Sequence, residues 1–190
     1  SRRFYSDLLI SPAVQKEYLK FYVVSDRTRP VPGTIRISLM NLDGTILKSF
    51  VRDVNIAALT SRSYFDLRIA QLLEGIDAKN AVVYCELLAN GKVVSSHDYF
   101  FASFKDLSFS KPTIDSEVVR IRGGFKIKLS SDKFAKAVYL SVADHDGFFS
   151  DNYFNLAPGR EMTVEFRSRA PLALGEFEKQ LRIRSVYDAF

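Results

Sequence analysis

Residues 138–156 decide the fold, and they read VYLSVADHDGFFSDNYFNL. Val138, Leu140 and Val142 fall on one face of an extended chain, and the residues between them fall on the other. This period of two predicts a strand with one buried face. The polar residues at 144–147 predict a turn, and 153–156 predict a short second strand. A core strand, a polar turn and another short strand are typical of a corner in a β-sandwich.

The same alternation recurs along the chain roughly every 8 to 12 residues, with turn-forming residues between the strands. In the first half we expect strands at 8–12, ending at Pro12, and at 18–25, 34–41, 46–55, 64–67, 81–89 and 92–101. In the second half we expect them at 113–121, 125–129, 137–142, 153–156, 162–166 and 178–186. Asp43-Gly44 and Asn90-Gly91 are strong hairpin signals, because glycine tolerates the positive φ of such turns. The predicted fold class is all-β, with a single helical turn expected at 69–73.

The strand pattern predicts two consecutive immunoglobulin-like β-sandwich domains. A length of 190 residues allows one large domain or two small ones. The first domain is expected at 1–104, as an immunoglobulin-like or carbohydrate-binding-like sandwich, and the C-terminal immunoglobulin-like sandwich at 112–190. Apolar residues around 105–111 predict a docked linker rather than a flexible tether. The abrupt start, without an initiator Met, indicates a fragment of a longer polypeptide or a processed chain.

The charge distribution argues against a nucleic-acid partner. The net charge is +5 at pH 7, but Lys and Arg are scattered and alternate with apolar residues, as they do over 120–128. A nucleic-acid binder gathers its basic residues on one face or in a run. We therefore interpret them as the solvated faces of strands. No run approaches the roughly 20 apolar residues of a membrane-spanning helix, so no membrane span is expected.

The single cysteine, Cys85, rules out an internal disulfide, so the fold must rest on its apolar core. Cys85 lies in the apolar stretch 81–88, which indicates a buried structural thiol rather than a nucleophile. The cysteine content does not decide the compartment, because proteins without disulfides occur in the cytosol, the periplasm and outside the cell.

The Asp-rich turn at 144–151 invites a metal-site interpretation. Asp144, Asp146 and Asp151 could supply oxygen ligands to Ca²⁺, but position 155, which would carry the last acidic ligand of an EF-hand loop, is Asn. His97 and His145 are the only histidines, and zinc needs three or four convergent ligands. We therefore expect no metal and no cofactor.

The sequence also offers no catalytic constellation. The nucleophile elbow Gly-x-Ser-x-Gly is absent, as are glycine-rich phosphate loops and dinucleotide fingerprints. Glycoside hydrolysis needs two carboxylates that face each other across a sugar, and Glu86 and Glu165 lie in ordinary strand patterns. No catalytic residue is predicted.

Aromatic residues are the best candidates for contacts outside the core. We identify Tyr99, Phe101, Phe148, Phe149 and Tyr153 as candidate sugar or interdomain contacts. Exposed rings can stack on sugars, although the chain has no Trp, the residue with the largest flat amphipathic surface. The alternative is that one ring of each neighbouring pair faces the core and the other packs on the adjacent domain.

The chain resembles the C-terminal part of β-mannosidases of glycoside hydrolase family two, over nearly its whole length. The resemblance is most specific at Ser150-Asp151-Asn152-Tyr153-Phe154. It is also carried by 21–26, Gly33-Thr34, Asp43-Gly44, 99–101 with 105–107, 138–141, Phe149, Leu156, Pro158-Gly159 and 183–188. The family has Asp where this chain has Asn155, which further weakens a metal interpretation of the loop.

The resemblance implies a non-catalytic region that follows a catalytic (β/α)₈ barrel. The family's acid/base and nucleophile glutamates lie in that barrel, and no match to their motifs occurs here, so no catalytic residue carries over. The parent enzyme would hydrolyse terminal non-reducing β-D-mannose residues by a retaining mechanism. The expected partners are the catalytic barrel of the parent chain and mannose-containing glycans, in a bacterial periplasmic or secreted location rather than a lysosomal one. The alternatives are an autonomous carbohydrate-binding module and a generic immunoglobulin-like interaction module.

Overall fold

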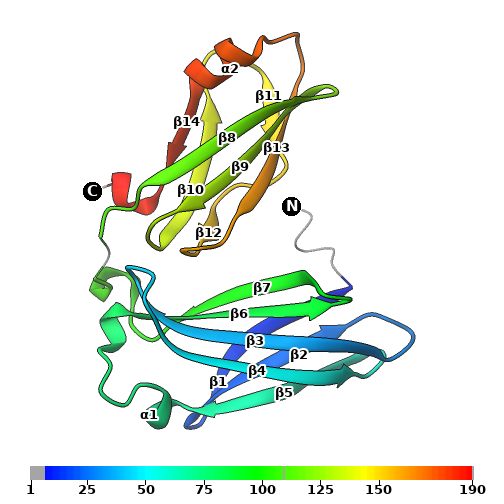
Figure 1. Ribbon diagram of the computed structural model, residues 1–190, viewed down its shortest axis with the longest axis vertical. Helices are drawn as coiled ribbons and strands as arrows, with labels where there is room; N and C mark the ends of the chain where they lie inside the picture. The colour runs from blue at the N-terminus through cyan, green and yellow to red at the C-terminus, as the bar shows by residue number, and fades with distance from the viewer. Residues whose placement is uncertain (1–6, 109, 190) are drawn as a thin grey trace. The chain divides into compact units, whose positions relative to one another are not determined.

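The structure, a computed structural model, describes residues 7–108 and 110–189 (Figure 1). These residues divide into two units, one formed by 7–108 and the other by 110–189. Each unit consists of two antiparallel sheets that enclose an apolar core of its own. The predicted all-β class, with two immunoglobulin-like sandwiches, is therefore confirmed.

The first unit contains seven strands in the part of the chain described. They are β1 (Leu8–Gln15), β2 (Tyr18–Ser25), β3 (Val31–Asn41), β4 (Ile46–Ile56), β5 (Thr60–Arg68), β6 (Ala81–Ala89) and β7 (Lys92–Phe100). One sheet has the order β1-β2-β5, and the other has the order β4-β3-β6-β7. The short helices α1 (Ile69–Leu72), η2 (Ala78–Asn80) and η3 (Phe104–Asp106) lie in the connections.

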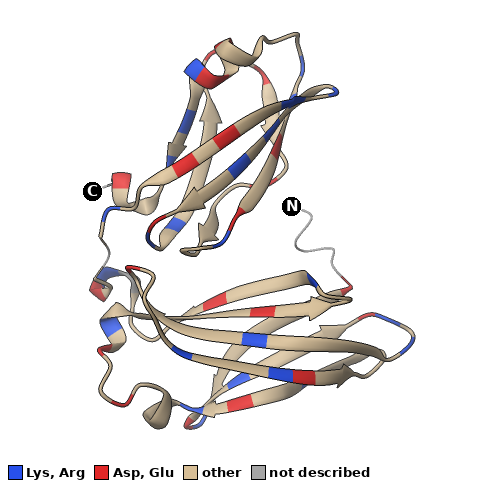
Figure 2. Cartoon of the chain, in the orientation of Figure 1, with Lys and Arg blue, Asp and Glu red and all other residues tan. Residues whose placement is uncertain are grey.

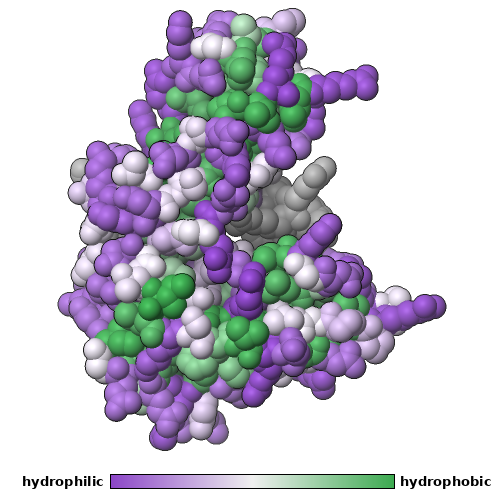
Figure 3. Space-filling view, viewed as in Figure 1, coloured by the Kyte–Doolittle hydropathy of each residue, from purple (hydrophilic) through white to green (hydrophobic). Residues whose placement is uncertain are grey.

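Alternating apolar residues build the core of the first unit. Leu19, Phe21 and Val23 of β2 are fully buried, as the period of two predicts. Both predicted hairpins form, and Gly44 and Gly91 have φ values of +95° and +71°. Charged residues of both signs are interspersed on the strands (Figure 2). In the view of Figure 3, hydrophobic residues occur as small areas separated by hydrophilic ones.

The second unit also contains seven strands within its described residues. They are β8 (Ile114–Ile121), β9 (Gly124–Ser131), β10 (Ala135–Val142), β11 (Gly147–Phe149), β12 (Phe154–Leu156), β13 (Met162–Ser168) and β14 (Leu181–Arg184), with the helices α2 (Leu174–Gln180) and η4 (Val186–Ala189). The sheet orders are β11-β13-β9-β8 and β12-β10-β14. Val138 and Leu140 of β10 point into the core, as predicted.

Two expectations about individual elements are wrong. The strand expected at 8–12 does not end at Pro12 but continues to Gln15, with Pro12 opposite Phe21. Proline is tolerated there because β1 is an edge strand of its sheet and the missing N–H breaks no central ladder.

The strand expected at 178–186 is the second error, because helix α2 occupies Leu174–Gln180 and β14 begins only at Leu181. Phe177 of this helix is fully buried and stacks on Phe125, with ring centroids 4.2 Å apart. The helix places Leu174 and Phe177 on one face, and both pack into the core. This helical spacing was the signal that the strand interpretation overlooked.

Candidate functional site

Asn152 attaches the loop before β12 to the core strand β10. Its side-chain Oδ1 accepts a hydrogen bond from the Leu140 N–H at 2.7 Å, and its Nδ2 donates to the Leu140 carbonyl at 2.9 Å. One side-chain amide thus takes the place of a strand residue in the ladder. The Asp151 carboxylate accepts from the Asn152 N–H at 2.9 Å and helps to hold the loop.

Asn155 makes a second attachment three residues later. Its Oδ1 accepts from the Ala137 N–H at 2.8 Å. Ala137 has a φ of +48°, and the pairing of β10 with β12 shifts register between Ala135 and Val138. Such a shift marks a β-bulge, which redirects the side chains that follow it. Residues 138–156 therefore form a corner held by two asparagine side chains.

This corner holds two tyrosine rings against each other. Tyr153 has a φ of +58°, and its ring stacks on that of Tyr139 with centroids 4.9 Å apart and an interplanar angle of 28°. We call these two residues the tyrosine pair. Tyr153 is 70% exposed and Tyr139 is 37% exposed. A left-handed conformation costs an L-residue about 1–2 kcal/mol, and so exposed a ring recovers little of it by burial.

Polar residues of β10 and β14 surround the tyrosine pair. Tyr139 lies opposite Arg184 in the ladder, and Ser141 lies opposite Arg182. The Arg182 guanidinium donates to two main-chain carbonyls, at 2.6 and 3.1 Å. Arg184 is exposed, and within the described residues its guanidinium has no hydrogen bond or ion pair. It is therefore a free hydrogen-bond donor beside an exposed aromatic pair.

The structure divides the five predicted aromatic contacts between the two units. Tyr99 and Phe101 belong to the first unit, are half-buried and meet edge to face at 5.3 Å. In the second unit, Phe149 is half-buried against its core, whereas Phe148 on β11 is 60% exposed. Tyr153 is the most exposed of the five. Their contact roles stay a prediction.

Sequence reasoning overlooked Tyr139 and Arg184. The alternation of β10 did place Tyr139 on the outward face. However, its contact with Tyr153 and its position opposite Arg184 depend on the bulge and on the pairing of β10 with β14. Those features are tertiary and leave no local pattern in the sequence.

The Asp-rich loop shows ordinary structural contacts. Asp146 lies 3.7 Å from Arg169, and the Nε2 of His145 lies 3.2 Å from the Ser168 hydroxyl. Within residues 7–108 and 110–189, no three side chains of His, Cys, Asp or Glu gather in an arrangement that could hold a metal ion.

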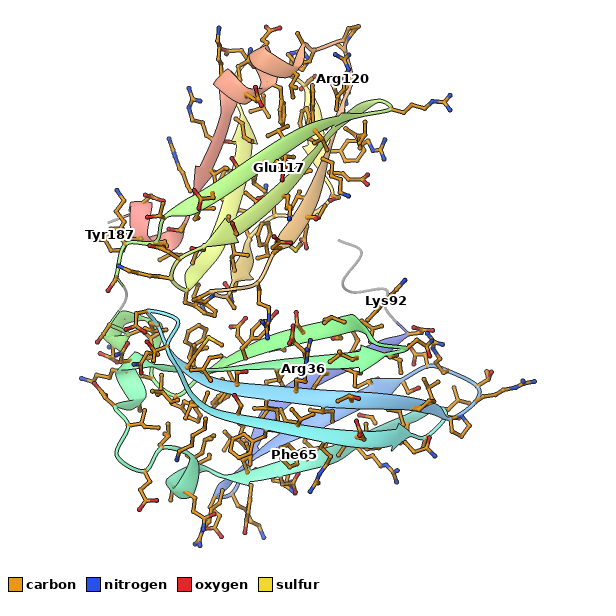
Figure 4. All side chains as sticks on the ribbon, in the orientation of Figure 1. Arg36, Phe65, Lys92, Glu117, Arg120 and Tyr187 are labelled. Atoms are coloured by element: carbon orange, nitrogen blue, oxygen red, sulfur yellow. The ribbon has the colours of Figure 1, made fainter. Side chains whose placement is uncertain are left out.

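Cys85 is buried on β6, and its thiol donates to the His97 carbonyl with an Sγ–O distance of 3.3 Å. Burial raises the pKa of the Cys85 thiol far above its usual range, so the nucleophilic thiolate does not form at neutral pH. The neighbouring Glu86 is also buried and pairs with Arg36 at 3.1 Å on the adjacent strand β3 (Figure 4). These features are those of structural groups.

A shallow depression of moderate size is found in each unit. That of the first unit has a volume of about 550 Å³, and its lining mixes polar residues such as Thr34 and Asp53 with apolar ones such as Val54 and Leu88. That of the second unit, about 350 Å³, lies at the β8–β9 turn beside Arg120 (Figure 4). The first is lined by no aromatic residue, and the one ring of the second, Phe125, is buried. Neither presents a surface on which a planar ligand could stack.

The helices in the described part of the chain are all too short and too polar to cross a bilayer.

Two family models match the chain, one for each unit. Residues 17–106 match the Mannosidase Ig/CBM-like domain. Residues 109–189 match the Ig-fold domain of the Ig_mannosidase family. Together the two matches cover the chain except for residues 1–16, 107–108 and 190.

Curated relatives extend the match over the whole chain. Beta-mannosidase A of Neosartorya fischeri is 23% identical over 212 residues, covering 99% of this chain and 22% of the relative. Beta-mannosidase of Capra hircus is 25% identical over 197 residues, covering 100% of this chain and 22% of the relative. The chain therefore spans about 22% of the length of these relatives and corresponds to their immunoglobulin-like, non-catalytic part.

A solved structure has the same fold. The β-D-mannosidase from Dictyoglomus thermophilum superposes with a TM-score of 0.83 and 22% sequence identity, over 97% of this chain and 22% of that protein. In that protein, as in the curated relatives, the region is one part of a much larger chain.

Proposed function

We infer that this chain, whose two units belong to the Mannosidase Ig/CBM-like and Ig-fold domain families, is the non-catalytic region of a β-mannosidase. The observation that carries the inference is the match of both units, in order, to one contiguous region of β-mannosidases. Glu86 and Glu165 lie in different units and pair with Arg36 and Arg167, which supports a non-catalytic role for both. The parent would hydrolyse terminal non-reducing β-D-mannose residues with a retaining mechanism.

In the parent, the two sandwiches would brace the catalytic barrel and help to shape the substrate entrance. The test is to incubate the purified chain with an aryl β-D-mannoside. We expect no release of the aryl alcohol above the rate in buffer. Turnover that copurifies with the chain through several columns would refute the assignment.

Besides the catalytic barrel, we propose mannose-containing glycans as a partner that the chain itself binds. The observation in its favour is the exposed tyrosine pair with a free arginine beside it. The specific site is developed below.

We propose domain boundaries at 1–104 and 112–190, with 105–111 as a docked linker. In support, the Ser108 N–H donates to the Lys79 carbonyl at 2.9 Å, and the Leu107 side chain is half-buried. Limited trypsin digestion tests the linker at Lys105 and Lys111. A docked linker predicts slow cleavage at these lysines, whereas rapid division of the chain into two halves would refute it.

For the location, we propose the bacterial periplasm or secretion in preference to a lysosome. The proposal rests on the similarity of the chain to β-mannosidases. Fractionation of the source cells tests it, and recovery of the native protein in the cytosolic fraction would contradict it.

A further inference from the structure

We propose that the tyrosine pair is the binding site for one hexopyranose ring of a neutral glycan. Tyr153 would supply the stacking surface, Tyr139 its support, and Arg184 a hydrogen-bond donor to the sugar hydroxyls. The inference deepens the glycan-binding part of the proposed function. It is tested by binding to this chain, and therefore succeeds or fails independently of the hydrolytic activity proposed for the parent.

The first argument is the conformation of Tyr153. A bulky residue in the left-handed region is strained, and such strain concentrates at binding and catalytic sites. Here the strained residue contributes little to the core, because 70% of it is exposed. The neighbouring Phe154 and the β10 residue Val138 fill the interior instead. The Tyr153 ring is therefore held out into solvent by its own backbone.

The second argument is rigidity. Tyr139 stacks on the Tyr153 ring with centroids 4.9 Å apart, and Tyr153 stays 70% exposed. The main chain just before Tyr153 is fixed by the two hydrogen bonds from Asn152 to Leu140. A ligand that stacks on an immobilised ring pays less conformational entropy than one that must first order a mobile side chain. The site is thus organised before any ligand arrives.

The third argument is the chemistry of the neighbours. A pyranose presents an apolar face of C–H groups and a rim of hydroxyls, so it needs an aromatic plane with polar groups around it. Arg184 is exposed opposite Tyr139, and the phenolic hydroxyls can both donate and accept. Arg182 is held through its Nη1 by two main-chain carbonyls, whereas the whole guanidinium of Arg184 is available.

The fourth argument is size, which favours a sugar over a protein partner. A stable protein interface buries about 800 Å² on each side around an apolar centre. The exposed aromatic surface described here consists of Tyr153 and part of Tyr139, and Ser141, Arg182 and Arg184 lie next to Tyr139 in the β10–β14 ladder. A single-stranded nucleic acid would also stack on an aromatic ring, but it needs a row of cations along its backbone as well. One free arginine matches one sugar ring better.

The experiment is a titration of the 190-residue chain with methyl β-D-mannopyranoside, β-1,4-mannobiose and cellobiose. Tyrosine fluorescence is a direct reporter because the chain has 9 Tyr and no Trp, and isothermal calorimetry provides the affinity. We expect binding of at least one of these sugars in the micromolar to millimolar range. We expect Tyr153→Ala to weaken it by roughly tenfold or more, and Tyr153→Phe, which keeps the ring, by less than about threefold.

Two further variants separate the roles of the neighbours. Arg184→Ala should weaken binding several-fold without changing the thermal unfolding midpoint. Tyr18→Ala removes a tyrosine of the first unit with the same 37% exposure as Tyr139 and should leave affinity unchanged. Circular dichroism confirms that each variant is folded.

Three outcomes would overturn the proposal. The first is that wild-type chain binds none of the three sugars at 10 mM or so. The second is that a sugar binds equally well to wild type and to folded Tyr153→Ala. The third is that a short oligonucleotide, and no sugar, binds in a manner that depends on Tyr153.

Discussion

Replacement of Asn152 by alanine removes one of the two side-chain attachments that hold the end of the corner to β10. The variant loses two hydrogen bonds, to the N–H and the carbonyl of Leu140, at 2.7 and 2.9 Å. Each hydrogen bond contributes about 1 kcal/mol, and a buried group left without a partner costs about 1–3 kcal/mol. Leu140 is only 1% exposed, so water replaces the lost partners poorly. We expect Asn152→Ala to lower the unfolding free energy of the second unit by about 2–4 kcal/mol.

The assay is thermal unfolding followed by calorimetry, which separates two units that unfold at different temperatures. At roughly 4–8 °C per kcal/mol for a unit of this size, the midpoint should fall by about 10 °C or more. Hydrogen exchange provides the local readout, because the Leu140 amide should lose protection in the variant. The matched control is Asn55→Ala, which removes an exposed asparagine with no side-chain hydrogen bond among the described residues, and it should change stability by less than about 0.5 kcal/mol. An Asn152→Ala loss as small as the control's, with Leu140 still protected, would refute the reasoning.

Three further predictions concern glycine, the aromatic core and the thiol. Gly124→Ala should destabilise the second unit by about 2 kcal/mol or more, because the new Cβ would lie 1.9 Å from a main-chain oxygen. Gly175→Ala in α2 places its Cβ where nothing lies within 4 Å, and it should stabilise the unit by about 0.5–1 kcal/mol. Urea titrations that rank the two variants in the opposite order would contradict this. Phe177→Ala should cost about 3–5 kcal/mol because it empties a buried site stacked on Phe125, and a thermal midpoint within 3 °C or so of wild type would show that α2 is not part of the core. Cys85 should resist iodoacetamide at pH 8 in the folded chain and react with it in urea. The reason is that burial raises the pKa of the thiol, so the reactive thiolate does not form. Rapid labelling of the native protein would show that β6 opens.

The strand pattern was predictable wherever one face of a strand is buried. In β2 and β10 the period of two identified the core residues correctly, because burial on one side leaves a direct trace in the sequence. The predicted hairpin turns at Gly44 and Gly91 follow from local backbone requirements and were found for the same reason.

The errors arose where tertiary context decides the local structure. Pro12 is compatible with β1 only because β1 is an edge strand, and strand order cannot be read from a local pattern. Helix α2 has just seven residues, so its only local signal is the three-residue spacing of the core residues Leu174 and Phe177. The tyrosine pair depends on the bulge near Ala137 and on pairing between strands about 40 residues apart, so only Tyr153 was a candidate from sequence.

The most direct measurement is the hydrolysis of an aryl β-D-mannoside by two proteins in parallel. One is the 190-residue chain, and the other is the longer β-mannosidase that we propose contains it. We predict that the chain releases no aryl alcohol, while the full-length protein does so and prefers the β-mannoside to the matching β-glucoside and β-galactoside. Turnover by the chain, or a full-length protein that hydrolyses another glycoside and leaves the β-mannoside intact, would contradict the assignment.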